Sequence, residues 1–307
     1  MKSLKKQGGF TLLELLVVVG LMAAVAVVAV STFDNADESA SVSTDLSNIQ
    51  TIDQGVRSFT SSHSGNIPEQ LDHLLVAGDA YRALDPETLE ILTTLPTASG
   101  IGAKVLANLV DSGMEELQTI TGGAGGQNDT ATETAIELGD PNAAHAEANG
   151  GKELPFTAAN ITHLAVFAET PTDAAGDTVA CELGGVAANF PTVTLLGGTN
   201  VGAPNALNKF NDSFEAGTCN LVVAFGVGND AAANSEGALG NNAPSSDAVK
   251  HKDTTYSRYL ALFHVAADAD ENGNITEDEV FDTPRFVGAV NPHGEGKNAL
   301  NIKKNAQ

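Results

Sequence analysis

The sequence predicts an α+β fold, in which a long N-terminal helix packs on a C-terminal antiparallel β-sheet head that carries a helical insertion. Three observations support this prediction. Residues 10–30 are almost wholly apolar, and no proline occurs between Phe10 and Ile67. Short β-like runs, separated by Gly, Asn, Asp and Pro clusters, begin after Lys152. The order of these features indicates one helix followed by a sheet.

The second half of the predicted helix carries one apolar stripe at three- and four-residue spacing, which is typical of a helix that buries one face. The stripe consists of Val42, Leu46, Ile49, Ile52, Val56 and Phe59. We expect the helix to end near His63, because Gly65 and Pro68 follow. Such a helix is about 80 Å long at 1.5 Å per residue.

The remaining chain contains an expected helical insertion, a linker and a set of strands. Helical signals occur at residues 69–76 and again at 85–121, with pieces at 103–110 and 114–120. Residues 122–151 hold hardly any large apolar residue, which predicts a flexible linker. The predicted strands are 161–168, 192–196, 221–227, 259–266 and 286–290.

The net charge of the chain is −24, from 15 basic and 39 acidic residues. Such a surface repels phosphate backbones, so we expect no nucleic acid to bind this protein alone. The two cysteines, Cys181 and Cys219, lie far beyond the apolar run. A disulfide between them is favoured outside the cell, where such bonds persist. Two buried free thiols are the alternative.

The apolar run at residues 10–30 is long enough to cross a bilayer as one helix, but it contains the carboxylate of Glu14. An ordinary secretory signal has a shorter apolar region without a carboxylate. A charge at mid-membrane costs about 3 kcal/mol and usually has a partner. If the chain is cut before Phe10, the new α-amine, with a pKa of about 8, is that partner.

The residues Gly9-Phe10-Thr11-Leu12-Leu13-Glu14-Leu15, after a short lysine-bearing leader, resemble the prepilin signature of type IV pilins and type II secretion pseudopilins. The resemblance implies a pilin-like fold. It also implies that a membrane peptidase cuts after Gly9 and methylates Phe10, and that Glu14 is the glutamate used in assembly. Removing the three leader lysines leaves a mature net charge of −27.

By this resemblance the chain divides into a leader at 1–9, a transmembrane or filament-core helix at 10–30, a helical continuation with the insertion at 31–121, a linker at 122–151 and a head at 152–307. The implied function is that of a structural subunit in a type IV pilus-like or type II secretion pseudopilus filament. Its expected partners are copies of itself, other pilin-like subunits, the prepilin peptidase and an inner-membrane assembly platform.

The precursor is expected in the inner membrane, because the leader lysines place the leader in the cytoplasm and the head outside. The mature subunit is then expected in a periplasmic or cell-surface filament. An alternative stays open, namely a secreted or membrane-anchored calcium-binding adhesive module with an ordinary export signal.

Residues 268–279 match the twelve-residue calcium loop found in EF-hands and dockerins. Calcium takes six to eight oxygen ligands, and the alternating positions of this loop bring oxygens to one side of a turn. The predicted ligands are Asp268, Asp270, Asn272, the backbone carbonyl of Asn274, Thr276 and a bidentate Glu279. Gly273 allows the sharp bend. We therefore predict one structural Ca²⁺, with an acidic surface turn as the alternative.

The sequence contains no phosphate-binding loop, no zinc-binding helix of the His-Glu-x-x-His type and no Gly-x-Ser-x-Gly elbow. The seven histidines are scattered without ligand spacing. We therefore predict that the protein is not an enzyme and has no catalytic residues.

Overall fold

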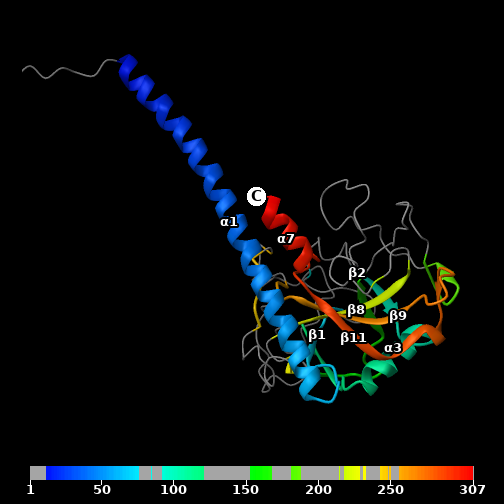
Figure 1. Ribbon diagram of the computed structural model, residues 1–307. Helices are drawn as coiled ribbons and strands as arrows, with labels where there is room; N and C mark the ends of the chain where they lie inside the picture. Colours follow the sequence, from blue (N-terminus) through cyan, green and yellow to red (C-terminus); the bar gives the residue numbers. More distant parts are fainter. Residues whose placement is uncertain are drawn as a thin grey trace, which may run out of the picture.

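The computed structural model of the chain describes the long helix, the sheet and the C-terminal region (Figure 1). The described residues are 12–75, 84, 92–120, 153–167, 181–187, 214, 218–228, 231–232, 243–247, 249 and 256–306. The helices there are α1 (Leu12–Ser62), α3 (Gly100–Asp111), α7 (Lys297–Ala306) and the 3₁₀ turn η2 (Glu277–Glu279). The strands are β1 (Leu71–His73), β2 (Leu92–Pro96), β3 (Glu116–Thr119), β4 (Glu153–Pro155), β5 (His163–Phe167), β6 (Glu182–Leu183), β7 (Val186–Ala187), β8 (Asn220–Gly226), β9 (Leu260–Ala267), β10 (Asn274–Ile275) and β11 (Val280–Val290).

Helix α1 is one continuous helix of 51 residues, which confirms the predicted long helix and its predicted end. Two consecutive residues with positive φ follow it, Ser64 at 61° and Gly65 at 95°. The Gly65 N–H donates to the Thr60 carbonyl at 2.8 Å, as in a helix C-terminus that closes through a left-handed residue. The chain therefore turns away from the helix axis directly after Ser62.

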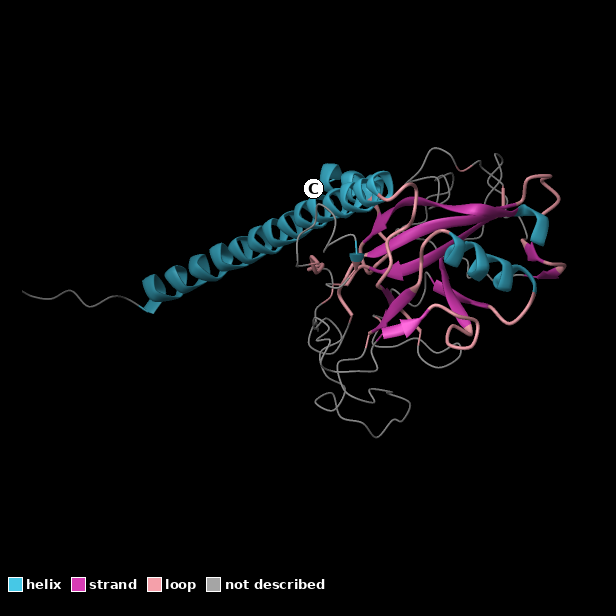
Figure 2. Cartoon of the chain, turned by 90° about the horizontal axis from the view of Figure 1, so that it is seen from below, coloured by secondary structure: helices cyan, strands magenta, loops and turns pink. Residues whose placement is uncertain are grey.

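The two halves of α1 have different surroundings. The first half extends beyond the sheet (Figure 2), and the large apolar side chains described there, from Leu12 to Val25, are exposed, with Leu16 at 67% and Met22 at 69%. The second half packs on β11 and α7. The predicted stripe faces this contact: Leu46 is partly buried, and Val42, Ile49, Ile52, Val56 and Phe59 are at most 6% exposed. The stripe prediction is confirmed.

Eight of the described strands form one large sheet in the order β11-β9-β8-β1-β3-β4, in which β5 also pairs with β8 and β2 pairs with β5. Strands β10, β6 and β7 form a separate small sheet. The large sheet is mixed, so the predicted antiparallel arrangement holds for most of its strand pairs but not for all. The exception is the parallel pair of β1 and β3, in which Leu71 lies opposite Leu117. The chain between these strands contains α3, and a helical crossover is the usual way to return a strand in the same direction.

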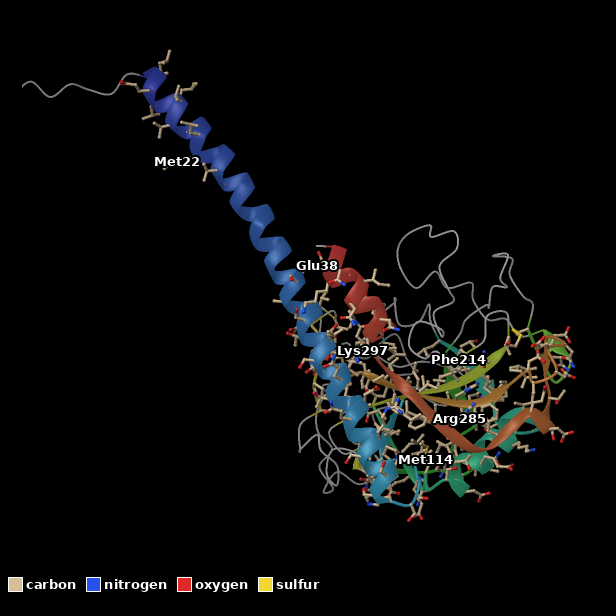
Figure 3. The ribbon with its side chains drawn as sticks, viewed as in Figure 1. Met22, Glu38, Met114, Phe214, Arg285 and Lys297 are labelled. Carbon is tan, nitrogen blue, oxygen red and sulfur yellow. A yellow bond between two sulfur atoms is a disulfide. The ribbon has the colours of Figure 1, made fainter. Side chains whose placement is uncertain are left out.

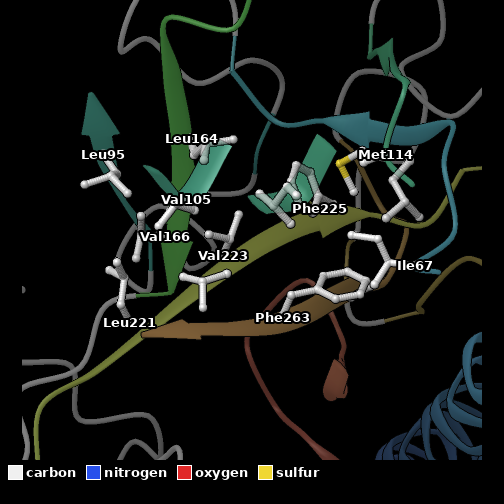
Figure 4. Packing of buried hydrophobic residues seen from close by; sticks show 14 of the residues in the cluster. Ile67, Leu95, Val105, Met114, Leu164, Val166, Leu221, Val223, Phe225 and Phe263 are labelled. Carbon is white, nitrogen blue, oxygen red and sulfur yellow. The ribbon is translucent and has the colours of Figure 1, made fainter. Parts of the chain in front are cut away.

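The central strands β8 and β9 are buried on both faces. On one face Val223, Phe225 and Phe263 join a core with apolar residues of α1 and α3 (Figure 4). On the other face Val222 and Leu262 belong to a second cluster. Because both faces are covered, these strands have continuous apolar sequences rather than alternating ones.

The insertion is less helical than predicted. Helix α3 confirms the predicted piece at 103–110, but β1 lies within 69–76, β2 within 85–121 and β3 within 114–120, so the helical predictions fail there. Each of these strands has three to five residues, and in so short a run leucine spacing does not separate helix from strand. Pairing with neighbouring strands in the sheet decides that these short runs form strands rather than helices.

The strand predictions after residue 152 agree better with the structure. The runs at 161–168, 221–227 and 259–266 correspond to β5, β8 and β9. The run at 286–290 is the second half of β11, which begins earlier, at Val280. The run at 192–196 lies outside the described residues, as do the predicted leader at 1–9 and linker at 122–151.

Helix α7 lies beside the second half of α1. The Lys303 ammonium is 3.8 Å from Oε1 of Glu38 on α1 and 3.4 Å from Oε1 of Glu295. Figure 3 shows Glu38 on the side of α1 that faces α7. No helix in the described part of the chain is both long enough and apolar enough to span a membrane.

Candidate functional site

The structure describes the N-terminal signature in part. Gly9 and Phe10 lie outside the described residues, whereas Glu14 lies in the first turn of α1 with an exposed side chain. The neighbouring Leu13 and Leu15 are 72% and 61% exposed. This end of α1 therefore presents apolar side chains to its surroundings, together with one carboxylate.

The predicted calcium loop follows β9, contains β10 and η2, and leads into β11. Glu271 and Gly273 have positive φ values of 57° and 83°, so the loop bends sharply where glycine was predicted to allow it. The buried Asp268 carboxylate accepts hydrogen bonds from the Asn272 N–H at 3.1 Å and the Gly273 N–H at 2.7 Å. These bonds fold the first half of the loop around Asp268.

Three carboxylates converge inside the loop. One oxygen from each of Asp268, Asp270 and Glu279 lies within 4.8 Å of the other two. Asp268 is buried, Asp270 is exposed and Glu279 is partly exposed, so the group is open to solvent on one side. Like charges this close repel each other unless a cation lies between them. The group could hold a metal ion.

Both oxygens of Glu279 are oriented by the loop itself. Oε1 accepts from the Ala269 N–H at 2.7 Å, and Oε2 accepts from the Thr276 N–H at 2.8 Å and the Thr276 hydroxyl at 3.1 Å. Burial alone raises the pKa of Glu279, but these bonds and one from the Asp270 N–H outweigh it and hold the pKa below its ordinary value. Glu279 is therefore ionised, as a metal ligand must be.

The structure places the other predicted ligands around the same turn. The Asn272 side chain donates to Asp270 Oδ2 at 2.9 Å, and its Oδ1 accepts from the Asn274 N–H at 2.7 Å. The Asn274 side chain turns away from the loop and accepts the Gly185 N–H at 2.8 Å. The carbonyls of Gly273 and Ile275 accept the N–H groups of Glu182 and Gly184. Since carbonyls alternate along a strand, that of Asn274 faces the other way.

The cysteines form a disulfide, with their Cα atoms 5.8 Å apart. Cys181 directly precedes β6, and Cys219 directly precedes β8. The bond lies next to the loop, because the Asp268 N–H donates to the Cys219 carbonyl at 2.9 Å. Nothing in the sequence indicated that the β6–β7 hairpin contacts the loop, since about 90 residues separate Gly185 from Asn274.

The donors around the turn are all oxygens: carboxylates, amide and hydroxyl oxygens, and a backbone carbonyl. This donor set suits a hard cation such as Ca²⁺ and contains no sulfur or imidazole for softer metals. Hydrogen bonds from N–H groups of the loop orient the carboxylates of Asp268 and Glu279. The residues present therefore fit a calcium ion at this place.

Comparison with known proteins identifies one family model. Residues 4–30 match the prokaryotic N-terminal methylation motif, which is the signature of type IV pilins and pseudopilins. No curated protein and no solved structure matches the chain. The match thus covers Lys5, Lys6, Gly9 and the apolar run, and it ends before the head.

Proposed function

We propose that this protein is a structural subunit of a type IV pilus-like or type II secretion pseudopilus filament. The observation that carries the proposal is the methylation motif at residues 4–30, which continues into one uninterrupted helix. The first half of that helix exposes apolar side chains, and the second half packs on the head. The motif points to a structural, non-enzymatic subunit family.

The proposed life cycle begins with a precursor that is anchored in the inner membrane by residues 10–30, with its leader in the cytoplasm. Prepilin peptidase then cuts after Gly9 and methylates the amine of Phe10. The basic leader and the position of the motif support this order. The released subunit joins a periplasmic or cell-surface filament through an inner-membrane assembly platform.

Assembly is proposed to use the exposed first half of α1. Burying its leucines, valines and Met22 against neighbouring helices contributes about 25 cal/mol per Å² of apolar surface removed from water. Glu14 must then also leave water, which is costly without a cation. We propose that the Phe10 amine of a neighbouring subunit supplies that cation.

The head is proposed to hold one structural Ca²⁺ in the loop at 268–279. The support is the convergence of three carboxylates and the oriented oxygens of Glu279. The proposed ligands are Asp268, Asp270, Asn272, Asn274 through its carbonyl, Thr276 and Glu279. A cation there neutralises the repulsion among the carboxylates, and it stabilises the folded head because the unfolded chain has no such site.

The filament proposal is tested by expressing a Glu14→Leu variant in cells that contain the assembly machinery and measuring the subunit in sheared filaments. We expect processing to continue and incorporation to fall strongly. Glu38→Gln is the matched control, because Glu38 is an exposed glutamate of α1 outside the motif. Unchanged incorporation of Glu14→Leu favours the alternative of an exported calcium-binding adhesive module.

A further inference from the structure

The β6–β7 hairpin forms one side of the loop at 268–279. The Glu182 N–H donates to the Gly273 carbonyl at 2.7 Å, and the Gly184 N–H donates to the Ile275 carbonyl at 2.9 Å. The Gly185 N–H adds the bond to the Asn274 side chain at 2.8 Å. Three hydrogen bonds thus hold the middle of the loop, where the chain passes from Gly273 to Ile275.

The disulfide connects this hairpin to the start of the loop. Cys181 begins the hairpin, and its partner Cys219 accepts the Asp268 N–H at 2.9 Å through its carbonyl. Sγ of Cys219 also lies 3.9 Å from the Gly273 carbonyl oxygen. Both ends of the cystine therefore contact the loop, one through β6 and the other at its first residue.

Apart from these bonds, the hairpin contacts the head through Leu183, which packs against the main core. Strands β6, β7 and β10 have two residues each and form a small sheet separate from the large one. A two-stranded ribbon of this size is at best marginally stable in water. The covalent bond to Cys219 keeps β6 at high local concentration beside β10, which favours these three hydrogen bonds.

We propose that the Cys181–Cys219 disulfide controls the order of the loop at 268–279 and, through it, the affinity of the loop for a divalent cation. The cation half of this proposal rests on the calcium assignment made above. A dithiol reductant breaks the S–S bond: two electrons and two protons pass to the sulfurs of Cys181 and Cys219, and the reductant becomes a disulfide. The hairpin then separates from β10, and Asn274 and Gly273 lose their partners.

The coupling is reciprocal, because two linked equilibria shift each other by the same factor. Oxidation of the cysteines raises cation affinity, and a bound cation protects the disulfide from reduction. A chain that is exported with free thiols therefore acquires its full cation affinity only after oxidation outside the cytoplasm. This order keeps the loop from taking up cations tightly before the head has folded in its final compartment.

The test uses the purified full-length chain in detergent, with Ca²⁺ as the probe. Its Kd is measured by calorimetry for the oxidised protein, for the protein reduced by a dithiol, and for a Cys181→Ser/Cys219→Ser variant. We expect Ca²⁺ binding to weaken about tenfold or more in the reduced protein and in the variant, because both lack the disulfide. Saturating Ca²⁺ is expected to shift the thiol–disulfide equilibrium of Cys181 and Cys219 toward the disulfide by the same factor. Equal affinities in the oxidised and reduced forms overturn the proposal.

Hydrogen exchange of the metal-free protein separates this proposal from the calcium assignment. Amides of the loop, among them Gly273 and Asn274, are expected to exchange faster after reduction, while those of β8 and β9 keep their protection and show that the core stays folded. If the oxidised protein binds no Ca²⁺ but the loop loosens on reduction, the calcium assignment fails and the control by the disulfide stands. Unchanged exchange of the loop after reduction contradicts the control by the disulfide.

Discussion

The Tyr259 hydroxyl donates a hydrogen bond of 2.6 Å to Oδ1 of Asp45, and both side chains are buried between α1 and the sheet. Oδ2 of Asp45 accepts from the Ser246 hydroxyl and from the Asn291 side chain, each at 3.0 Å. Burial, and then the bond to Asp45 and its charge, raise the pKa of Tyr259 above its ordinary value, so its hydroxyl keeps its proton. One carboxylate of α1 thus satisfies three donors from separate parts of the head.

Replacing this carboxylate should weaken the attachment of α1. Asp45→Ala removes the acceptor that Tyr259, Ser246 and Asn291 share, and a buried donor that loses its partner costs about 1–3 kcal/mol. We expect the free energy of unfolding to fall by about 3 kcal/mol or more, measured by urea denaturation in detergent. Glu38→Gln, which removes only an exposed ion pair, should cost less than about 1 kcal/mol. Equal losses of unfolding free energy in Asp45→Ala and Glu38→Gln would show that the buried hydrogen bonds of Asp45 are unimportant.

The apolar stripe of α1 should stabilise the head, whereas its exposed half should not. Ile52 is fully buried and Leu16 is 67% exposed. Ile52→Ala is expected to lower the free energy of unfolding of the head by about 2–5 kcal/mol, because it leaves a cavity. Leu16→Ala is expected to leave it unchanged within about 0.5 kcal/mol. A large effect of Leu16→Ala on the isolated subunit argues against a free apolar surface.

Two buried histidines predict a loss of stability in mild acid. Burial lowers the pKa of His73 to about 4, and burial with the nearby Arg285 charge lowers that of His264 to about 4. The unfolded value is about 6.5, so between these values the unfolded chain binds protons that the native chain does not. Stability is therefore full above about pH 6.5 and falls as the pH approaches 4.

The acid-dependent loss is expected to be at most about 3 kcal/mol for each histidine, measured by urea denaturation at several pH values. His73→Gln should flatten the dependence over this range, whatever its effect on stability at neutral pH. A variant with the same slope as the natural protein shows that His73 does not contribute.

Calcium should raise the thermal midpoint of the head through Asp268. We expect the midpoint to rise with Ca²⁺ concentration and to fall with a chelator, as mass action requires for a site that only the folded chain possesses. Asp268→Asn should abolish this dependence. Asp282→Asn is the matched control, because Asp282 is an exposed carboxylate just beyond the loop. A dependence that survives Asp268→Asn places the cation elsewhere.

The long helix and the central strands could be predicted from the sequence because their signals are long and physically simple. The stripe from Val42 to Phe59 has the helical period, and the runs of β8 and β9 are too apolar to face water. The strands at Leu71, Leu92 and Leu117 could not be predicted, since each owes its form to a partner far away in the chain.

The candidate site also has one part with a local sequence signal and one part that depends on distant contacts. The ligand spacing of the loop is local, so Asp268, Asp270 and Glu279 could be chosen from the sequence, and the structure brings these three together. The support from the β6–β7 hairpin is not local: Gly185 reaches Asn274 only because the Cys181–Cys219 bond and the fold place them side by side. Spacing within a sequence contains no information about such contacts.

The central claim is tested most directly by mass spectrometry of the N-terminus of the mature protein, isolated from cells that contain prepilin peptidase. The expected result is a chain that begins at Phe10 and carries one methyl group on its α-amine. A chain that retains residues 1–9, or one that is cut within the apolar run and begins unmethylated at Val27, contradicts the assignment to a filament subunit.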